Sequence, residues 1–108
     1  MNADLSYTSG EMTLTGFELE NATITENWWQ KYGRIVEFQI IFTPSSSSIS
    51  IGESLAGGLP RAVQSGTFTT FGTTGNVVVK NQSGGAYLEN TVYMSGSVTL
   101  HGVYISET

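Results

Sequence analysis

The sequence predicts an all-β fold, an antiparallel β-sandwich of one domain spanning residues 1–108. Apolar residues alternate with polar ones along much of the chain, and this two-residue period is typical of a strand with one buried face. Glycine-containing turn signals separate these stretches at short intervals, as in sandwiches and barrels. Charged residues make up only 12% of the chain, and 27 of the 108 residues are serine or threonine. Coiled coils and helical bundles need far more Ala, Glu, Lys and Leu, so both are excluded.

The clearest strand covers residues 34–43, where apolar residues alternate with polar ones until Pro44 ends the pattern. Ile35 and Ile41 add apolar surface to the opposite face of this strand. Strands that are apolar on both faces are usually covered on both faces. We therefore expect this strand to lie in the middle of its sheet, with a layer of protein on each side.

The C-terminal segment carries a change in its apolar pattern. Val98 and Leu100 share one parity, whereas Val103 and Ile105, after Gly102, share the other. A parity change at a glycine predicts a β-bulge or bend, because one extra residue rotates the side chains that follow.

The rest of the chain predicts further short strands and the turns between them. A similar parity change occurs at Gly16, and a helix over residues 17–32 is disfavoured by the many threonines and asparagines there. Turns are expected at residues 32–33, at Gly57-Gly58, at residues 72–75 and in a hairpin loop over residues 81–85. The further strands are expected over residues 5–8, 21–26, 48–51, 67–71, 76–80 and 86–89.

The charge balance excludes several partners. Nine acidic residues against four Lys and Arg give a net charge of −5, which does not suit nucleic acid or an anionic membrane. The apolar stretches are too short for membrane insertion. The chain has no cysteine, so we expect no disulfide. It has no metal-ligand or phosphate-loop motif, so no metal or cofactor is predicted, and whether a metal ion binds stays open. A small domain without disulfides often gains stability by oligomerisation.

No catalytic residue is predicted. His101 and Asp4 are the only histidine and the only aspartate, and no nucleophile-elbow pattern occurs. Eight glutamates would place some pair together by chance, but none is marked by its spacing. The sequence therefore favours a binding or structural protein over an enzyme.

Aromatic residues are the remaining candidates for a binding site. Trp28, Trp29 and Tyr32 cluster before a glycine, and in a strand the two tryptophans face opposite ways. An exposed ring could stack on the apolar face of a sugar, while polar side chains bind its hydroxyls. The same rings could equally be packing residues, and both interpretations stay open. The candidate saccharide-binding residues are Trp29, Tyr32, Arg34, Tyr87 and His101.

Three segments together resemble a known family. They are residues 29–38 (Trp-Gln-Lys-Tyr-Gly-Arg-Ile-Val-Glu-Phe), the run from Ile51-Gly52 to Gly58-Leu59-Pro60 that follows a Thr/Ser-rich stretch, and residues 97–105 with the pattern Ser-Val-Thr-Leu-His-Gly-Val-Tyr-Ile. This pattern resembles the C-terminal head domains of tail fibres and receptor-binding proteins of phages that infect Gram-positive bacteria. The likeness runs from Trp28 to the C-terminus. One departure is Arg61, since the family often continues Leu-Pro with Gly-x-Arg-Pro.

The resemblance implies a jelly-roll-like sandwich that forms a homotrimer at the virion tail tip. It also implies a non-enzymatic phage or prophage adhesin that recognises a host cell-surface saccharide and contacts other tail or baseplate proteins. Three alternatives stay open. They are a structural trimerising module of a fibre or baseplate without its own receptor, a carbohydrate-binding module attached to an enzyme, and a small glycan-cleaving enzyme.

Overall fold

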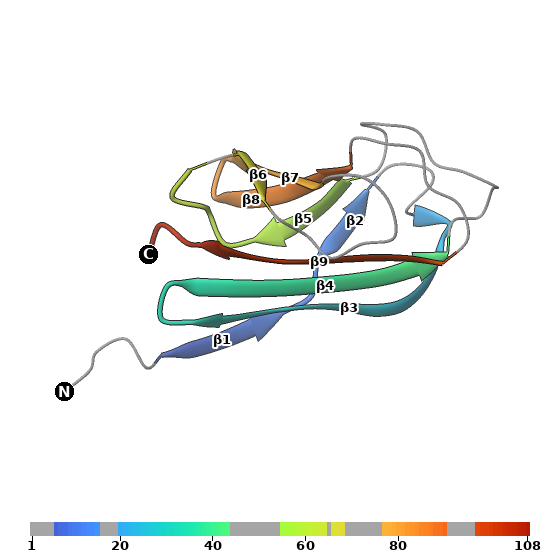
Figure 1. The fold of residues 1–108 in the computed structure, drawn as a ribbon, viewed down its shortest axis with the longest axis horizontal. Helices are drawn as coiled ribbons and strands as arrows, with labels where there is room; N and C mark the ends of the chain where they lie inside the picture. The colour runs from blue at the N-terminus through green and yellow to red at the C-terminus, as the bar shows by residue number, and fades with distance from the viewer. Residues whose placement is uncertain (1–5, 16–19, 44–54, 65, 69–76, 91–96) are drawn as a thin grey trace.

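The computed structural model describes residues 6–15, 20–43, 55–64, 66–68, 77–90 and 97–108, which form two antiparallel sheets (Figure 1). The four-stranded sheet has the order β1-β3-β4-β9, and the five-stranded sheet has the order β2-β5-β8-β7-β6. The all-β prediction is confirmed, and the two sheets are compatible with a β-sandwich. The strands are β1 (Tyr7–Gly10), β2 (Thr13–Thr15), β3 (Thr23–Tyr32), β4 (Ile35–Thr43), β5 (Leu55–Leu59), β6 (Gly66–Phe68), β7 (Val77–Gln82), β8 (Gly85–Asn90) and β9 (Val98–Ile105).

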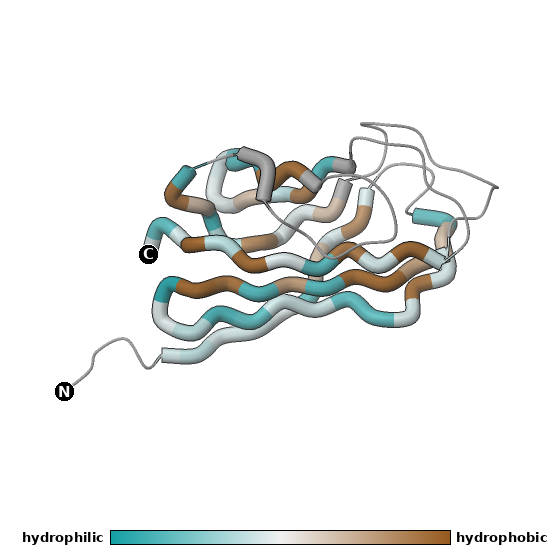
Figure 2. Tube along the Cα trace, in the orientation of Figure 1, coloured by the Kyte–Doolittle hydropathy of each residue, from teal (hydrophilic) through white to brown (hydrophobic). Residues whose placement is uncertain are grey.

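The hydrophobic core joins residues of both sheets. Figure 2 shows apolar residues along β4, β9 and the five-stranded sheet, whereas β1 and β3 are largely polar. The side chains on the inner face of β4 are at most 1% exposed, as the alternation in the sequence predicts. Core residues from β4 and β9 are Val36, Phe38, Ile40, Phe42, Val98, Leu100 and Tyr104, and those from β5, β7 and β8 are Ala56, Leu59, Val79, Ala86 and Leu88.

The position of β4 is as predicted, but the covering of its outer face is not. β4 lies between β3 and β9, so it is an interior strand of its sheet. Ile35, however, is 45% exposed on the outer face. The expectation that both faces are covered is wrong for the described residues, because only the inner face meets the second sheet.

The segment before β4 forms a strand, β3, and not a helix. β3 runs for ten residues and pairs with β4 through a tight turn, where Gly33 has φ of 57°. In this register Trp29 lies opposite Phe38, and Trp28 lies opposite Gln39. Since Phe38 faces the core, Trp29 faces inward and Trp28 faces outward.

The predicted bulge at Gly102 is absent. β9 pairs with β4 in unbroken register, from Ile35 opposite Ile105 to Phe42 opposite Val98. Tyr104 takes the core position beyond Gly102. The parity prediction was wrong because Val103 and Ile105 are apolar residues that face outward and stay 47% and 44% exposed.

The predicted turn at Gly57-Gly58 is instead a bulge within β5. Ala56 pairs with Leu88 and Leu59 pairs with Ala86, so two glycines occupy the length of one residue on β8. The hairpin over residues 81–85 is confirmed, with a two-residue turn between β7 and β8. The predicted strand over residues 48–51 and the parity change at Gly16 lie outside the described residues.

Candidate functional site

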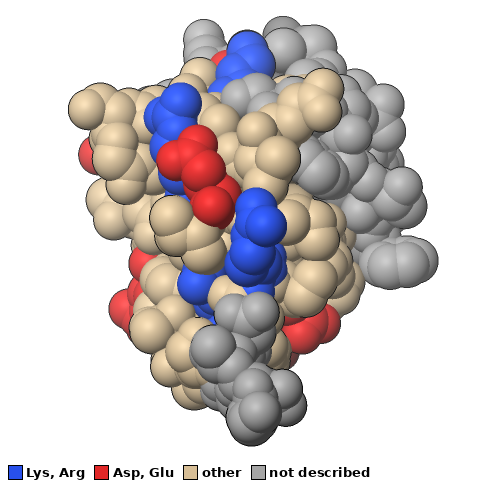
Figure 3. Space-filling model, turned by 90° about the vertical axis from the view of Figure 1, so that its left-hand side faces the viewer, with Lys and Arg blue, Asp and Glu red and all other residues tan. Residues whose placement is uncertain are grey.

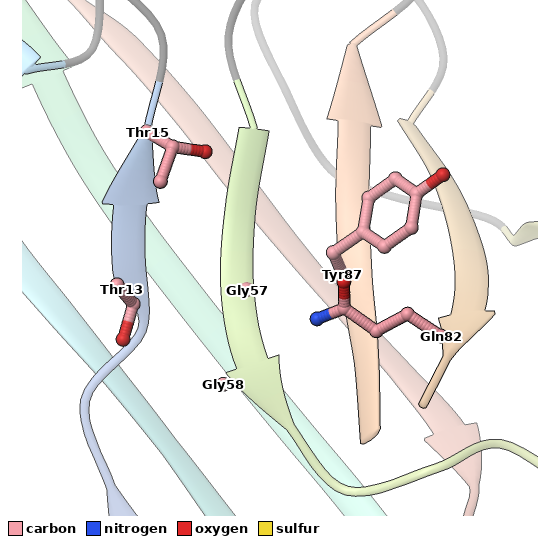
Figure 4. Close-up of a pocket in the computed structure, with 6 residues that line it drawn as sticks. All are labelled: Thr13, Thr15, Gly57, Gly58, Gln82 and Tyr87. Carbon is pink, nitrogen blue, oxygen red and sulfur yellow. The ribbon is translucent and has the colours of Figure 1, made fainter. Parts of the chain in front are cut away.

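The candidate site is a groove on the outer face of the five-stranded sheet, with a volume of about 310 Å³. Its floor is the Gly57-Gly58 backbone on β5 (Figure 4). Thr13 and Thr15 on β2 form one wall, and Tyr87 on β8 with Gln82 on β7 forms the other. We call this the glycine groove.

The bulge in β5 creates the depth of the glycine groove. Gly57 and Gly58 both lie opposite Tyr87 of β8. Because neither has a side chain, β5 places no side chain between the two walls of the groove. A Cβ built on Gly57 would stand 3.5 Å from Gln82 Nε2 and 3.8 Å from Tyr87 Cβ, so an alanine fits only by filling the floor. Gly58 has φ of 86°, a conformation that favours glycine.

The groove offers uncharged hydrogen-bonding groups around an aromatic ring. Thr13 and Thr15 supply hydroxyls that donate and accept, and the amide of Gln82 does both. Figure 4 shows this amide reaching across β8 toward Gly57, with the ring of Tyr87 beside it. Among its described lining residues there is no carboxylate, histidine, lysine or arginine. The lining is therefore complementary to a neutral polyhydroxylated ring, but those residues supply no general acid or base for pH 7.

The structure does not bring the five sequence candidates together. Tyr87 lies in the glycine groove, whereas Tyr32 and His101 face outward from the four-stranded sheet. Trp29 faces inward and packs against the core. Arg34 lies in the β3–β4 turn, where its Nε donates to the Ser106 carbonyl oxygen at 3.0 Å. This contact makes Arg34 a residue that holds the C-terminal segment.

Trp28 is the outward tryptophan. Its Nε1 donates to Glu26 Oε1 at 3.1 Å, and its ring meets the His101 ring edge-on at 6.5 Å between centroids. His101 Nε2 lies 3.4 Å from Glu37 Oε2. The alternation of a strand separates the two tryptophans, but only the register shows which of them is outward.

Sequence reasoning missed most of the glycine groove. Thr13, Thr15 and Gln82 are ordinary polar residues of short strands, and nothing in their spacing marks them. The only signal was the pair Gly57-Gly58 between apolar neighbours, which can mark a bulge as well as a turn.

Within the described ranges, no group of three His, Asp or Glu residues is placed to hold a metal ion. The same ranges contain no helix long and apolar enough to cross a membrane. Comparisons with protein-family models, curated proteins and solved structures found no match.

Proposed function

We propose that the chain is a non-enzymatic saccharide-binding module and that the glycine groove holds one sugar ring. The observation that carries the proposal is the combination of a side-chain-free floor with the Tyr87 ring and three uncharged polar side chains. Sugar rings present an apolar face and a rim of hydroxyls, and such a ring is complementary to this lining.

We further propose that the module works at a phage or prophage tail tip, where it binds a host cell-surface saccharide next to other tail or baseplate proteins. Support comes from the resemblance that runs from Trp28 to the C-terminus, and the two antiparallel sheets are compatible with the jelly-roll type it implies. A structural trimerising module and a carbohydrate-binding module of an enzyme are the alternatives. Saccharide binding by the isolated chain would count against the structural trimerising module, which has no receptor of its own.

A homotrimer is part of the same proposal. Ile35, Val103 and Ile105 are each 44–47% exposed and adjacent on the outer face of the four-stranded sheet. Exposed apolar patches of this kind favour an interface. We call these three residues the apolar patch and propose it as the contact between subunits.

The test is a glycan array probed with the whole chain, followed by calorimetric titration of the saccharides that bind. Gly57→Val fills the floor of the groove, and Tyr87→Leu removes its ring. We expect Gly57→Val to weaken binding by about tenfold or more, because the valine side chain blocks the sugar ring. We expect Tyr87→Leu to weaken it by about two- to tenfold, because it removes a stacking contact of about 0.5–1.5 kcal/mol. Ser83→Ala, in the β7–β8 turn outside the groove lining, is the matched control and should bind like the wild type.

Circular dichroism of each variant separates loss of binding from loss of folding. Thr15→Val is a second, nearly isosteric variant that removes one hydroxyl, and we expect it to weaken binding by about fivefold. Binding that persists in Gly57→Val and Tyr87→Leu would place the saccharide elsewhere. Failure of the whole chain to bind any saccharide would overturn the proposed function.

A further inference from the structure

A second hollow lies on the outer face of the four-stranded sheet, away from the glycine groove. It has a volume of about 390 Å³, and its lining includes Tyr7, Ser9, Glu11, Trp28 and Gln30. Ser9 pairs with Gln30 across β1 and β3. Because the strands are antiparallel, Tyr7 and Trp28 stand on opposite sides of this pair. We call this site the Tyr7–Trp28 hollow.

Both aromatic walls of the hollow are held in place by contacts of their own. The Tyr7 hydroxyl donates to Gln30 Oε1 at 3.1 Å, and its ring lies 4.8 Å from the ring of Tyr32. Trp28 is fixed by its hydrogen bond to Glu26 Oε1, which also accepts from Gln39 Nε2 at 2.7 Å. Side chains that are already ordered lose little conformational entropy when a ligand binds.

The charge on this face is of one sign. Glu11 lines the hollow, and Glu26 and Glu37 face outward from β3 and β4. No described outward-facing position of β1, β3, β4 or β9 carries a lysine or arginine. Figure 3 shows Lys and Arg side chains gathered instead at the end of the molecule that carries the β3–β4 turn and the C-terminus. Two of those bases are already paired, Arg61 with Glu107 and Lys80 with Glu89.

Glu11 differs from the other two carboxylates of this face. Glu26 accepts two hydrogen bonds, and Glu37 lies beside His101. Glu11 is exposed and makes no hydrogen bond or ion pair to another residue of the described ranges. It follows β1 by one residue, next to the pair of Gly10 with Trp29, and so lies beside Trp28.

We propose that the Tyr7–Trp28 hollow binds an organic ammonium group. Cations are attracted to the faces of Trp and Tyr rings, and a carboxylate beside the rings adds an ionic contact. A neutral sugar could donate a hydroxyl to Glu11, but only a cation adds an ionic contact to its contact with the rings. This site does not depend on saccharide binding in the glycine groove, which has an uncharged lining.

The experiment titrates the whole chain with choline and, separately, with 3,3-dimethylbutan-1-ol, its uncharged analogue of the same shape. Binding is followed by tryptophan fluorescence and by the NMR shift of the Trp28 indole N–H. We expect choline to bind with a Kd on the order of millimolar and the neutral analogue to bind about fivefold more weakly. Added salt should weaken choline binding and leave the analogue unchanged.

Variants identify the groups responsible. Glu11→Gln should weaken choline binding by about two- to fivefold without changing the affinity for the analogue. Trp28→Leu should abolish the binding of both choline and its neutral analogue. Because this variant lacks the Trp28 indole, its binding is followed by the NMR shifts of the backbone amides around Ser9. Glu20→Gln removes an equal charge outside the lining of the hollow and is the control. Equal affinities for choline and its neutral analogue, unchanged choline binding in Glu11→Gln, or no choline binding at all would each overturn the proposal.

Discussion

The indole ring of Trp29 lies directly against the backbone of Gly10. The two residues pair across β1 and β3, and a Cβ built on Gly10 would stand 2.9 Å from Trp29 Nε1 and Cζ2. Trp29 Nε1 is buried and has no hydrogen-bond partner within the described ranges. A side chain at position 10 would therefore force β1 away from the sheet or displace the indole from the core.

Gly10→Ala should destabilise the protein by about 1–3 kcal/mol, the usual cost of forcing extra volume into a packed region. Gly57→Ala is the matched control, because its Cβ would meet its neighbours at 3.5 Å or more. Urea unfolding followed by tryptophan fluorescence measures both variants. Equal unfolding midpoints for the two would show that the Trp29 indole can yield to a methyl group.

The role of the two tryptophans illustrates what the sequence can and cannot predict. Alternation alone places Trp28 and Trp29 on opposite faces of a strand. The sequence candidates included Trp29, yet the structure places it inward and Trp28 outward. The choice depends on which β3 residue lies opposite Phe38, and a shift of one residue would reverse it.

The fold class was predictable because β4 has a regular pattern and glycines mark many of the turns. The glycine groove was not, because its walls come from β2, β7 and β8, which only the sheet order brings together. The outward-facing residues of β9 could not be assigned from the sequence for a related reason. Val103 and Ile105 are apolar but exposed, so hydropathy alone assigned them to the core.

The side-chain amide of Asn27 hydrogen-bonds both backbone groups of Met12, as a neighbouring strand would. Its Oδ1 accepts from the Met12 N–H at 2.8 Å, and its Nδ2 donates to the Met12 carbonyl at 3.0 Å. Asn27→Ala should lower the free energy of unfolding by about 1–3 kcal/mol, because it leaves two part-buried backbone groups without partners. Thr25→Ala on the same strand is the exposed control. Chemical denaturation that gives both variants the wild-type stability would show that water replaces the amide.

Tyr104 should make the protein sensitive to alkali. Burial raises its pKa above the ordinary value of 10, and its hydroxyl donates to the Pro60 carbonyl oxygen. The unfolded chain then loses this proton at a lower pH than the folded chain does. The contribution of Tyr104 to stability is full below about pH 10 and falls as the pH rises toward the folded pKa.

Tyr104→Phe tests this assignment. At pH 7 the variant should lose about 1 kcal/mol with its hydrogen bond. Between about pH 9 and 11 its urea midpoint should fall less steeply than that of the wild type, because the titrating group is gone. Parallel slopes over this range would assign the alkaline sensitivity to other groups.

The apolar patch should control self-association. Charged residues are depleted from the cores of interfaces, so a lysine in the patch should dissociate the proposed trimer. We expect light scattering after size-exclusion chromatography to give the wild type about three times its 11.6 kDa chain mass and Val103→Lys the mass of one chain. Val63→Lys is the control, since Val63 is also exposed, at 54%, but lies outside the patch. A monomeric wild type at micromolar concentration would contradict the trimer, and a trimeric Val103→Lys would move the contact to another surface.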